Sequence, residues 1–159
     1  MKLAEVQEDY KLLIISSEAF AHNSEMPRRY TCEGVNVNPP IQIGGIPEKT
    51  QGLTLIVDDP DAPRGTWVHW VVWNIPPTHR INEDEVPGVQ GINDFGVNLY
   101  GGPCPPSGTH HYHFRVYALD TLLDLPEGST RQQVELAMDN HIIGYGELVG
   151  LYHKKKHAF

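Results

Sequence analysis

Two carboxylates and a histidine that could act together lie close to one another in the middle of the chain. Asp59 and Asp61 belong to the run Asp-Pro-Asp-Ala-Pro at positions 59–63, and His69 follows shortly after it. Proline fixes its own φ and pushes the preceding residue toward extended geometry, so this corner should hold both carboxylates in place. The pair is a candidate site beside an imidazole, although Asp next to Pro also caps turns for purely structural reasons.

Two strands are expected to position these side chains. Residues 53–57 form an aliphatic run typical of a buried strand, and residues 66–75 form a second run rich in Trp and Val. Because side chains alternate along a strand, the residues expected on one face of the second run are Trp67, His69, Val71 and Trp73. We therefore place Trp67 in a pocket wall beside His69, and the other tryptophans in the core.

A second cluster of ring side chains occupies residues 110–113, with the sequence His-His-Tyr-His. Imidazole is the commonest metal ligand, so a metal site has to be considered. Residues 110–119 have the pattern of a strand, however, and alternation sends His111 and His113 to the face opposite His110 and Tyr112. Neighbouring strand residues do not easily converge on one ion. We therefore predict neither a metal nor a cofactor.

The two cysteines, Cys32 and Cys104, lack the spacing of a metal site. Residues 1–9 carry acids where a signal peptide needs an apolar run, and no window approaches transmembrane length. Thiols without a signal peptide are more often reduced than bridged. We therefore predict a cytoplasmic protein with two free thiols, and a disulfide is the alternative.

The length and charge of the chain limit its organisation and partners. With 159 residues, a single domain over positions 1–159 is expected, large enough to bury a sizeable core. The formal net charge is −8. Binding to nucleic acid or to an anionic membrane needs basic surface, so this charge disfavours both classes of partner.

Many short strands and glycine- or proline-rich turns predict a mainly β sandwich with one or two short helices. The clearest helix is expected over residues 130–140. Ser129 and Gln132 resemble a capping box that would open it, and its apolar pattern runs on to His141.

Two boundaries near the chain ends are also predicted. Gly144 and Gly146 should end the helical run, ahead of a last strand over residues 147–152. Residues 1–9 are expected to form a loose end or a short helical turn.

Two blocks of the chain resemble the signature of the phosphatidylethanolamine-binding proteins, in their short bacterial and archaeal form. The first is the run at 59–63 followed by Gly-Thr-Trp-Val-His-Trp at 65–70, and the second extends over residues 100–112. Weaker similarity is found elsewhere, so the resemblance spans nearly the whole chain, with the similar segments in the same order. It implies two stacked, mainly antiparallel sheets with a pocket at one end.

A cis peptide bond is predicted at Ala62–Pro63, because X–Pro bonds adopt the cis form at low cost and cis prolines mark tight corners. The family resemblance implies the same bond. It also adds a non-proline cis bond before Thr66.

The resemblance implies that the pocket binds a small anion, such as phosphate or a phosphoryl head group. Carried onto this chain, its wall consists of Asp59, Pro63, Trp67, His69, Gly102, Pro106, His110 and Tyr112. Imidazole N–H groups, a tyrosine hydroxyl and amides near a glycine are suitable donors to phosphate oxygens. A free carboxylate repels phosphate, so Asp59 must orient a histidine, bind an ammonium group of the ligand or be protonated.

We therefore predict a ligand-binding protein that is not an enzyme, acts as a regulator or inhibitor of another protein, and is a monomer or a homodimer. The loop between Pro106 and His110 is shorter than in animal members of the family, and the sequence ends soon after Tyr152. Both departures open the rim of the pocket. The ligands and regulatory partners of animal and plant members are therefore not carried over.

The alternative function is a cysteine-dependent hydrolase, with Cys104 as nucleophile, His110 as base and Asp59 as the residue that orients the base. Cys104 lies between two prolines and lacks a helix N-terminus that would activate its thiol. The sequence therefore favours binding over catalysis.

Overall fold

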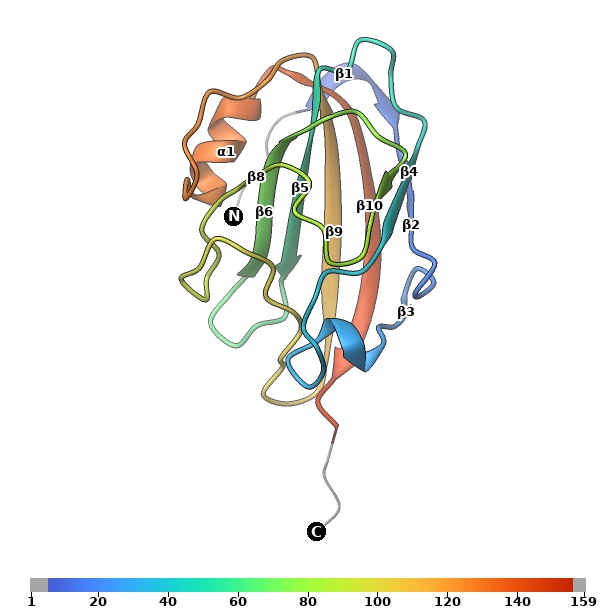
Figure 1. The fold of residues 1–159 in the computed structure, drawn as a ribbon, viewed down its shortest axis with the longest axis vertical. Coiled ribbons are helices and arrows are strands. Elements are labelled where there is room, and N and C mark those ends of the chain that lie inside the picture. Colours follow the sequence, from blue (N-terminus) through green and yellow to red (C-terminus); the bar gives the residue numbers. More distant parts are fainter. Residues whose placement is uncertain (1–5, 156–159) are drawn as a thin grey trace.

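Two β-sheets and one α-helix make up residues 6–155, the part of the chain that this computed structural model describes (Figure 1). The elements are β1 (Val6–Leu12), β2 (Ile14–Ser16), β3 (Ser24–Glu25), the 3-10 turn η1 (Arg28–Tyr30), β4 (Ile41–Gly44), β5 (Gly52–Asp59), β6 (Trp67–Ile75), β7 (Arg80–Ile81), β8 (Val89–Gln90), β9 (Thr109–Leu119), α1 (Arg131–Met138) and β10 (Ile142–His153). The larger sheet has the order β1-β10-β9-β5-β6-β8, with β3 also paired to β10, and the smaller has the order β2-β4-β7. The prediction of a mainly β sandwich is confirmed.

The centre of the larger sheet is antiparallel. β9 pairs with β10 on one side and with β5 on the other, and β5 pairs in turn with β6. Within the described chain, β1 and β3 are the strands that run parallel to a neighbour, which is β10 in both cases. The predicted strands at 53–57, 66–75 and 110–119 are β5, β6 and β9, whereas the predicted strand at 147–152 covers only the second half of β10.

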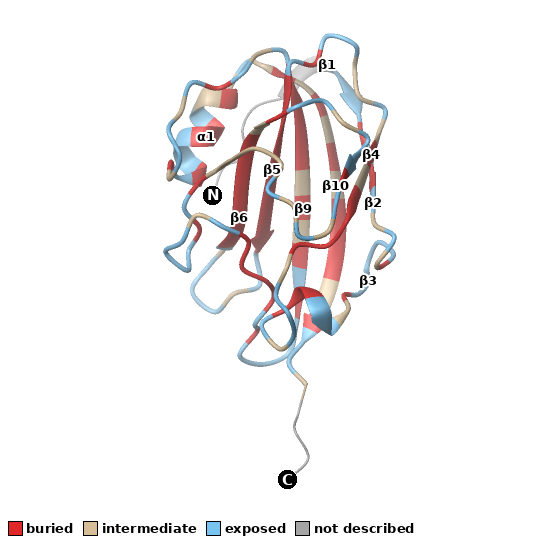
Figure 2. Cartoon of the chain, viewed as in Figure 1, coloured by how far each residue is buried: buried red, intermediate tan, exposed pale blue. Residues whose placement is uncertain are grey.

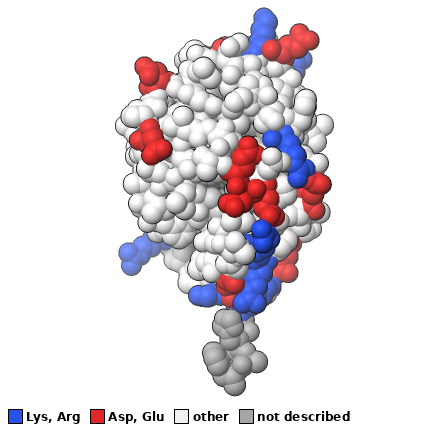
Figure 3. Space-filling view, in the orientation of Figure 1, with Lys and Arg blue, Asp and Glu red and all other residues white. Residues whose placement is uncertain are grey.

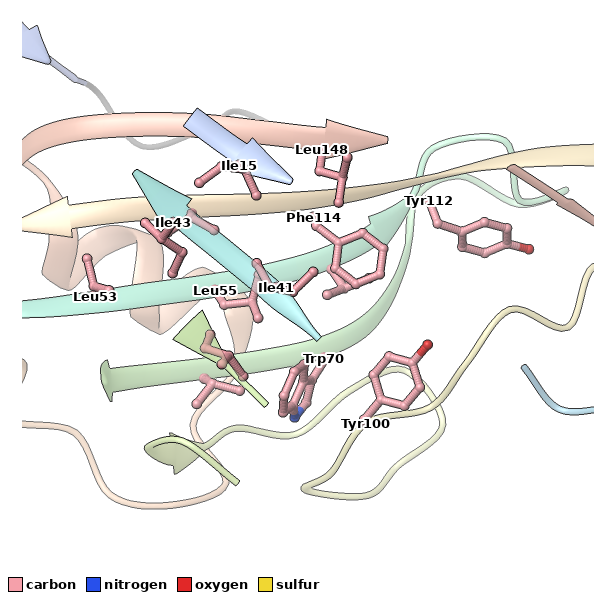
Figure 4. Close-up of a cluster of buried hydrophobic side chains, with 14 of the residues drawn as sticks. Ile15, Ile41, Ile43, Leu53, Leu55, Trp70, Tyr100, Tyr112, Phe114 and Leu148 are labelled. Carbon is pink, nitrogen blue, oxygen red and sulfur yellow. The ribbon is translucent and has the colours of Figure 1, made fainter. Parts of the chain in front are cut away.

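The main core lies between the two sheets. Ile15, Ile41 and Ile43 of the smaller sheet lie over Leu55 and Phe114 of the larger one, and all five are buried (Figure 4). Figure 2 shows β5 and β6 buried along almost their whole length. Burial on both faces requires a second apolar layer behind the larger sheet.

Helix α1 supplies that second layer. Val71 and Trp73 of β6 pack there with Val134 and Met138 of the helix, and none of the four is exposed. Burying a side chain of this size stabilises the fold by about 1.5–3 kcal/mol. The helix therefore holds the back of β6, the strand that carries His69 on its other side.

The helix begins one residue later than the predicted capping box implies. Thr130 Oγ1 accepts a hydrogen bond from the Gln133 amide at 3.2 Å, and the Gln133 side chain accepts one from the Thr130 amide at 2.9 Å. This reciprocal pair satisfies two helix-end donors. The prediction that Ser129 and Gln132 form the box is wrong by one position.

Two other boundaries differ from the prediction. The helix ends at Met138, and the chain turns through Asn140 with a φ of 67° before β10, so His141 lies outside the helix. Strand β1 begins at Val6, where a loose end or helical turn was expected. The remaining part of that prediction, residues 1–5, lies outside the described residues.

Gly144 and Gly146 lie inside β10, where the sequence suggested the end of a helical run. The chain passes from the larger to the smaller sheet at Leu13, directly over this strand. The Leu13 amide donates to the Tyr145 carbonyl at 2.8 Å. A Cβ atom on Gly146 would lie 2.3 Å from the Leu13 carbonyl oxygen, so glycine is needed for the close approach of two backbones.

We expect Gly146→Ala to lower the free energy of unfolding by about 1–3 kcal/mol, because the new methyl group meets backbone that cannot move aside. The matched control is Gly44→Ala, also in a strand, where a Cβ atom would lie 3.7 Å from its nearest neighbour. Urea denaturation followed by circular dichroism gives both values. Equal stability of the two variants would contradict the crossing described above.

Charged side chains are mixed on the surface. On the face shown in Figure 3, Lys and Arg side chains lie beside Asp and Glu side chains. This face offers no extended basic field to a polyanion. Within residues 6–155, none of the helical structure is long and apolar enough to cross a membrane.

Candidate functional site

A cavity of about 230 Å³ lies where β5 ends and where β6 and β9 begin. The residues that line it are Asp59, Ala62, Pro63, Trp67, His69, Phe95, Cys104, Pro105, Pro106, His110 and Tyr112. All the predicted wall residues except Gly102 are among them. The structure thus brings together side chains that are up to about a third of the chain apart in sequence, and their binding of a ligand stays a prediction.

His110 and Asp59 form a buried pair in this cavity. His110 Nδ1 lies 2.6 Å from Asp59 Oδ2, and the two side chains are 9% and 5% exposed. Asp59 Oδ1 accepts the Asp61 amide at 2.8 Å, so the carboxylate is held at both oxygens. Asp59 therefore orients a histidine, one of the three roles considered above. The ring nitrogen Nε2 of His110 is left without a partner in the described chain.

The other two histidines of β9 turn away from the cavity, as alternation predicts. His111 donates its amide and its ring Nδ1–H to Asp61 Oδ2, at 2.9 and 2.6 Å. Asp61 therefore has a structural role, outside the cavity. His113 Nδ1 lies 3.0 Å from Glu147 Oε1 on the far face. Residues 6–155 hold no group of three or more His, Cys, Asp or Glu side chains placed to bind a metal ion.

The corner before β6 is formed without a cis bond. All peptide bonds of the described residues are trans, so the predicted cis bonds at Ala62–Pro63 and before Thr66 are both wrong. The Gly65 amide donates to the Ala62 carbonyl at 3.1 Å, and Gly65 has a φ of 112°. A turn with glycine in a conformation that other residues avoid reverses the chain here, which the prediction assigned to an isomerised proline.

His69 faces the cavity because β6 carries a bulge at this point. The pairs that flank it in register are Val57 with Trp70 and Asp58 with Val68. His69 is therefore the extra residue of β6, and such bulges redirect side chains. Trp67 and His69 line the cavity, whereas Val71 and Trp73 pack against α1. The prediction that all four share one face is wrong because it assumed unbroken alternation.

The ring of His69 is fixed by backbone groups. Its Nδ1–H donates to the Gly101 carbonyl at 2.7 Å, and the Gly101 amide donates back to the His69 carbonyl at 3.1 Å. Burial lowers the pKa of His69, although the Gly101 carbonyl opposes this effect. The ring is therefore neutral at neutral pH, and its Nε2 is an acceptor.

Tyr112 contributes a hydroxyl that has no protein partner. The side chain is 1% exposed, and its oxygen makes no hydrogen bond to the described residues. The rings of His69 and His110 flank it, with centroids at 5.2 and 6.4 Å. Burial raises the pKa of Tyr112 above its ordinary value, and nearby Asp59 raises it further. The hydroxyl therefore stays protonated and can donate.

Gly102 does not offer its amide to the cavity as predicted. That amide donates to Asn36 Oδ1 at 2.8 Å. A Cβ atom at this position would lie 2.2 Å from the Tyr30 carbonyl oxygen. The glycine is thus required for close packing of two loops, and it acts behind the wall of the cavity.

Phe95 lines the cavity and Asn93 holds it in place, and neither residue was predicted from the sequence. Asn93 is 4% exposed and donates to the carbonyls of His69 and Leu99, at 3.0 and 2.8 Å. Its oxygen accepts the Phe95 amide at 3.0 Å. This places the Phe95 ring 5.3 Å from that of His69, at the rim of the cavity. The tendency of Asn to bond nearby backbone was the available signal.

Asp58 was also missed, and it fixes the end of β5 from behind. Its side chain is 1% exposed and faces away from the cavity. Arg115 Nε and Arg131 Nη1 approach Asp58 Oδ2 to 3.0 and 2.6 Å. A buried carboxylate needs such partners. Because side chains alternate at the end of β5, Asp58 points to the helix side of the sheet and Asp59 points into the cavity.

Cys32 and Cys104 form a disulfide, with their Cα atoms 5.4 Å apart, so the prediction of free thiols is wrong. The two loops that carry them are packed by contacts that sequence does not reveal, including a hydrogen bond from the Tyr100 hydroxyl to the Tyr30 carbonyl at 2.7 Å. The hydrolase alternative loses its nucleophile, because the thiolate is the reactive form. The prediction of a cytoplasmic protein was linked to reduced thiols, and it therefore loses that support.

A family model described as phosphatidylethanolamine-binding protein matches residues 16–153. A UPF0098 protein of Pyrococcus horikoshii is 50% identical over 156 residues, which cover 91% of this chain and 79% of that protein. A UPF0098 protein of Methanothermobacter thermautotrophicus is 47% identical over 148 residues, covering 88% and 98%.

Two solved structures are similar to this one over most of their length. A phosphatidylethanolamine-binding protein homologue from Chlamydia trachomatis has a TM-score of 0.88 and 39% identity, covering 91% of this chain and 99% of that one. YbcL of E. coli, described as a new member of the mammalian PEBP family, has a TM-score of 0.83 and 31% identity, covering 90% and 99%. Both share the sandwich described above.

Proposed function

Because this chain belongs to the phosphatidylethanolamine-binding protein family, we propose that it binds a small anionic ligand, a phosphate or a phosphoryl head group, beside His110. The observation that carries the proposal is the buried Tyr112 hydroxyl, which has no partner within residues 6–155. An unsatisfied buried hydroxyl costs about 1–3 kcal/mol. A ligand oxygen in the cavity would remove that cost.

Two groups of the wall would donate to the anion. The Tyr112 hydroxyl stays protonated, since burial raises its pKa. His110 donates Nδ1–H to Asp59, and a second proton would place a donor on Nε2. Hydrogen bonds in which one partner is charged contribute about 1.5–3 kcal/mol each. The Asp59 carboxylate does not itself meet the anion, because both its oxygens are engaged.

His69 adds a preference for a protonated phosphate. Its lowered pKa keeps the ring neutral, and the Gly101 carbonyl holds the proton on Nδ1. Nε2 can then accept a hydrogen bond, which a P–OH group can donate and a sulfate ion cannot. We therefore propose a phosphate or phosphomonoester monoanion as the bound species, with the hydroxyl of the phosphate on His69.

The rest of the wall suits the body that carries the phosphoryl group. Pro63, Trp67 and Phe95 give this side of the cavity apolar surface. A more open hollow of about 560 Å³ shares Pro63 and Trp67 with the cavity and contains Arg64. A ligand larger than inorganic phosphate could extend over Trp67 into that hollow. While Cys104 is held in the disulfide it offers no thiolate nucleophile, and we propose binding without catalysis.

The test uses Tyr112→Phe and inorganic phosphate in titration calorimetry. The variant should bind phosphate about ten- to a hundredfold more weakly, because one charge-assisted hydrogen bond is lost. Its stability without phosphate should be unchanged or higher, because removing an unpaired hydroxyl removes a cost. A merely structural tyrosine would show the opposite combination.

The matched control is Tyr117→Phe. Tyr117 lies on the same strand, is 1% exposed, and also has a buried hydroxyl without a partner among the described residues. It packs on the α1 side of the sheet. Its loss should leave phosphate affinity unchanged. Equal affinities of wild type, Tyr112→Phe and Tyr117→Phe would refute the proposed site.

A further inference from the structure

The Cys32–Cys104 disulfide is accessible to solvent at the wall of the cavity. Both cysteines are exposed, and Cys104 lines the cavity together with Pro105 and Pro106. Small thiols exchange with exposed disulfides far more readily than with buried structural ones. This bond therefore combines access for a thiol with a place in the candidate site.

Residues 104–108 depend on the disulfide for their position. In the described chain none of them makes a hydrogen bond, and Pro105 and Pro106 have no N–H to offer. The segments on either side are held firmly. The Cys32 amide donates to the Pro103 carbonyl at 3.0 Å, and strand β9 begins at Thr109. The sulfur of Cys104 is thus the covalent anchor of the proline side of the cavity wall, where Pro105 is also held by burial.

We propose that Cys104 is a thiol-exchange site whose state controls the shape of the cavity. The thiolate of a small-molecule thiol attacks Cys104 Sγ, a new sulfur–sulfur bond forms, and Cys32 leaves as a thiolate. A second thiolate attacks the small-molecule sulfur of this mixed disulfide. That step releases the oxidised small molecule and leaves Cys104 as a thiolate. Two electrons pass from the two thiols to the protein, and their two protons are available to the two cysteines.

Reduction of the disulfide should free the proline side of the cavity wall while the rest of the fold stays in place. Pro105 and Pro106 lose their only covalent tie to the loop of Cys32, while the His69 and His110 contacts remain. The opened cavity should then hold an anion less well, a consequence that rests on the proposed function. By linkage, a bound anion must favour the disulfide by the same factor.

The first experiment needs no anion. The oxidised full chain is incubated with reduced glutathione at pH 8, and alkylation with mass spectrometry identifies the modified cysteines. We expect a glutathione adduct on Cys104, followed by the dithiol, with no denaturant present. Acrylamide quenching should increase for Trp67, which lines the cavity and is 38% exposed, while the circular dichroism spectrum is unchanged. The Cys32→Ser/Cys104→Ser variant should show no response to glutathione.

The second experiment compares phosphate binding by the oxidised and reduced proteins. Reduction should weaken affinity at least about fivefold, and saturating phosphate should shift the thiol–disulfide equilibrium toward the disulfide by the same factor. The proposal is overturned if glutathione reacts only after unfolding, if an adduct forms with no change in Trp67 quenching, or if reduction abolishes the folded spectrum. If the oxidised protein does not bind phosphate, the proposed function is refuted. The glutathione and quenching results still test the proposal for Cys104 in that case.

Discussion

His110→Ala should lower the affinity for inorganic phosphate about ten- to a hundredfold. The substitution removes the ring nitrogen that has no partner in the described chain, and with it one charge-assisted hydrogen bond of about 1.5–3 kcal/mol. It also leaves the Asp59 carboxylate buried without its imidazole, which repels an anion. Titration calorimetry at pH 6.5 measures the effect.

The matched control for this variant is His113→Ala. His113 lies two residues further along β9, on the opposite face, and pairs with Glu147 at 3.0 Å. Loss of the His113 side chain should leave phosphate affinity within about twofold of wild type, because His113 shares no partner with the cavity residues and should act independently of them. A loss of affinity as large in His113→Ala as in His110→Ala would mean that general charge, and not the cavity, attracts the anion.

The preference for a monoanion carries a pH dependence. A phosphomonoester loses its second proton near pH 6, so lowering the pH from about 8 to 6 raises the share of the species that can donate a P–OH hydrogen bond to His69. Affinity for a phosphomonoester should therefore rise as the pH falls. The lowered pKa of His69 favours the neutral ring that accepts this hydrogen bond. Sulfate keeps its charge over this range and has no proton to donate, so it should not show this gain in affinity.

The Cys32→Ser/Cys104→Ser variant should be less stable than the oxidised protein by about 4 kcal/mol. The two cysteines are 72 positions apart, and a cross-link over such a loop removes much of the conformational entropy of the unfolded chain. Urea denaturation in the absence and presence of dithiothreitol gives the comparison. Typical domains are stable by about 5–15 kcal/mol, so the variant should still be folded without denaturant.

Reduced wild-type protein is the control for the serine substitutions. It should unfold at the same urea concentration as the variant, and dithiothreitol should not affect the variant itself. A difference below about 1 kcal/mol between oxidised and reduced protein would mean that the disulfide does not constrain the unfolded chain in this way.

The parts of the site that follow regular patterns were predictable from sequence. Strict alternation along β9 placed His110 and Tyr112 on the cavity side and His113 on the other. The prolines of the corner indicated a fixed Asp59. These predictions succeeded because strand alternation and proline geometry are local properties.

The bulge at His69 illustrates what a local pattern misses. Alternation predicted one face for His69 and Trp73, yet the extra residue puts them on opposite sides of the sheet. A bulge depends on how β5 and β6 are paired, and nothing in the sequence of β6 fixes that pairing.

Contacts between distant loops were the other source of error. The disulfide requires the loops of Cys32 and Cys104 to meet, and the sequence offered only the expected compartment as a guide. Asn93 likewise reads as an ordinary loop residue until the structure shows it bonded to the carbonyl of His69. Such residues are recognised only when the fold has brought their partners together.

The most direct test of the anion site is a histidine-selective ¹⁵N NMR titration with inorganic phosphate. Spectra that correlate ring nitrogens with ring protons report each histidine separately. We predict a saturable change at His110 Nε2, toward the protonated ring, with a smaller change at His69 and none at His113. Saturation should occur at the same phosphate concentration for both affected rings. No change at His110, or equal changes at His110 and His113, would contradict an anion bound in this cavity.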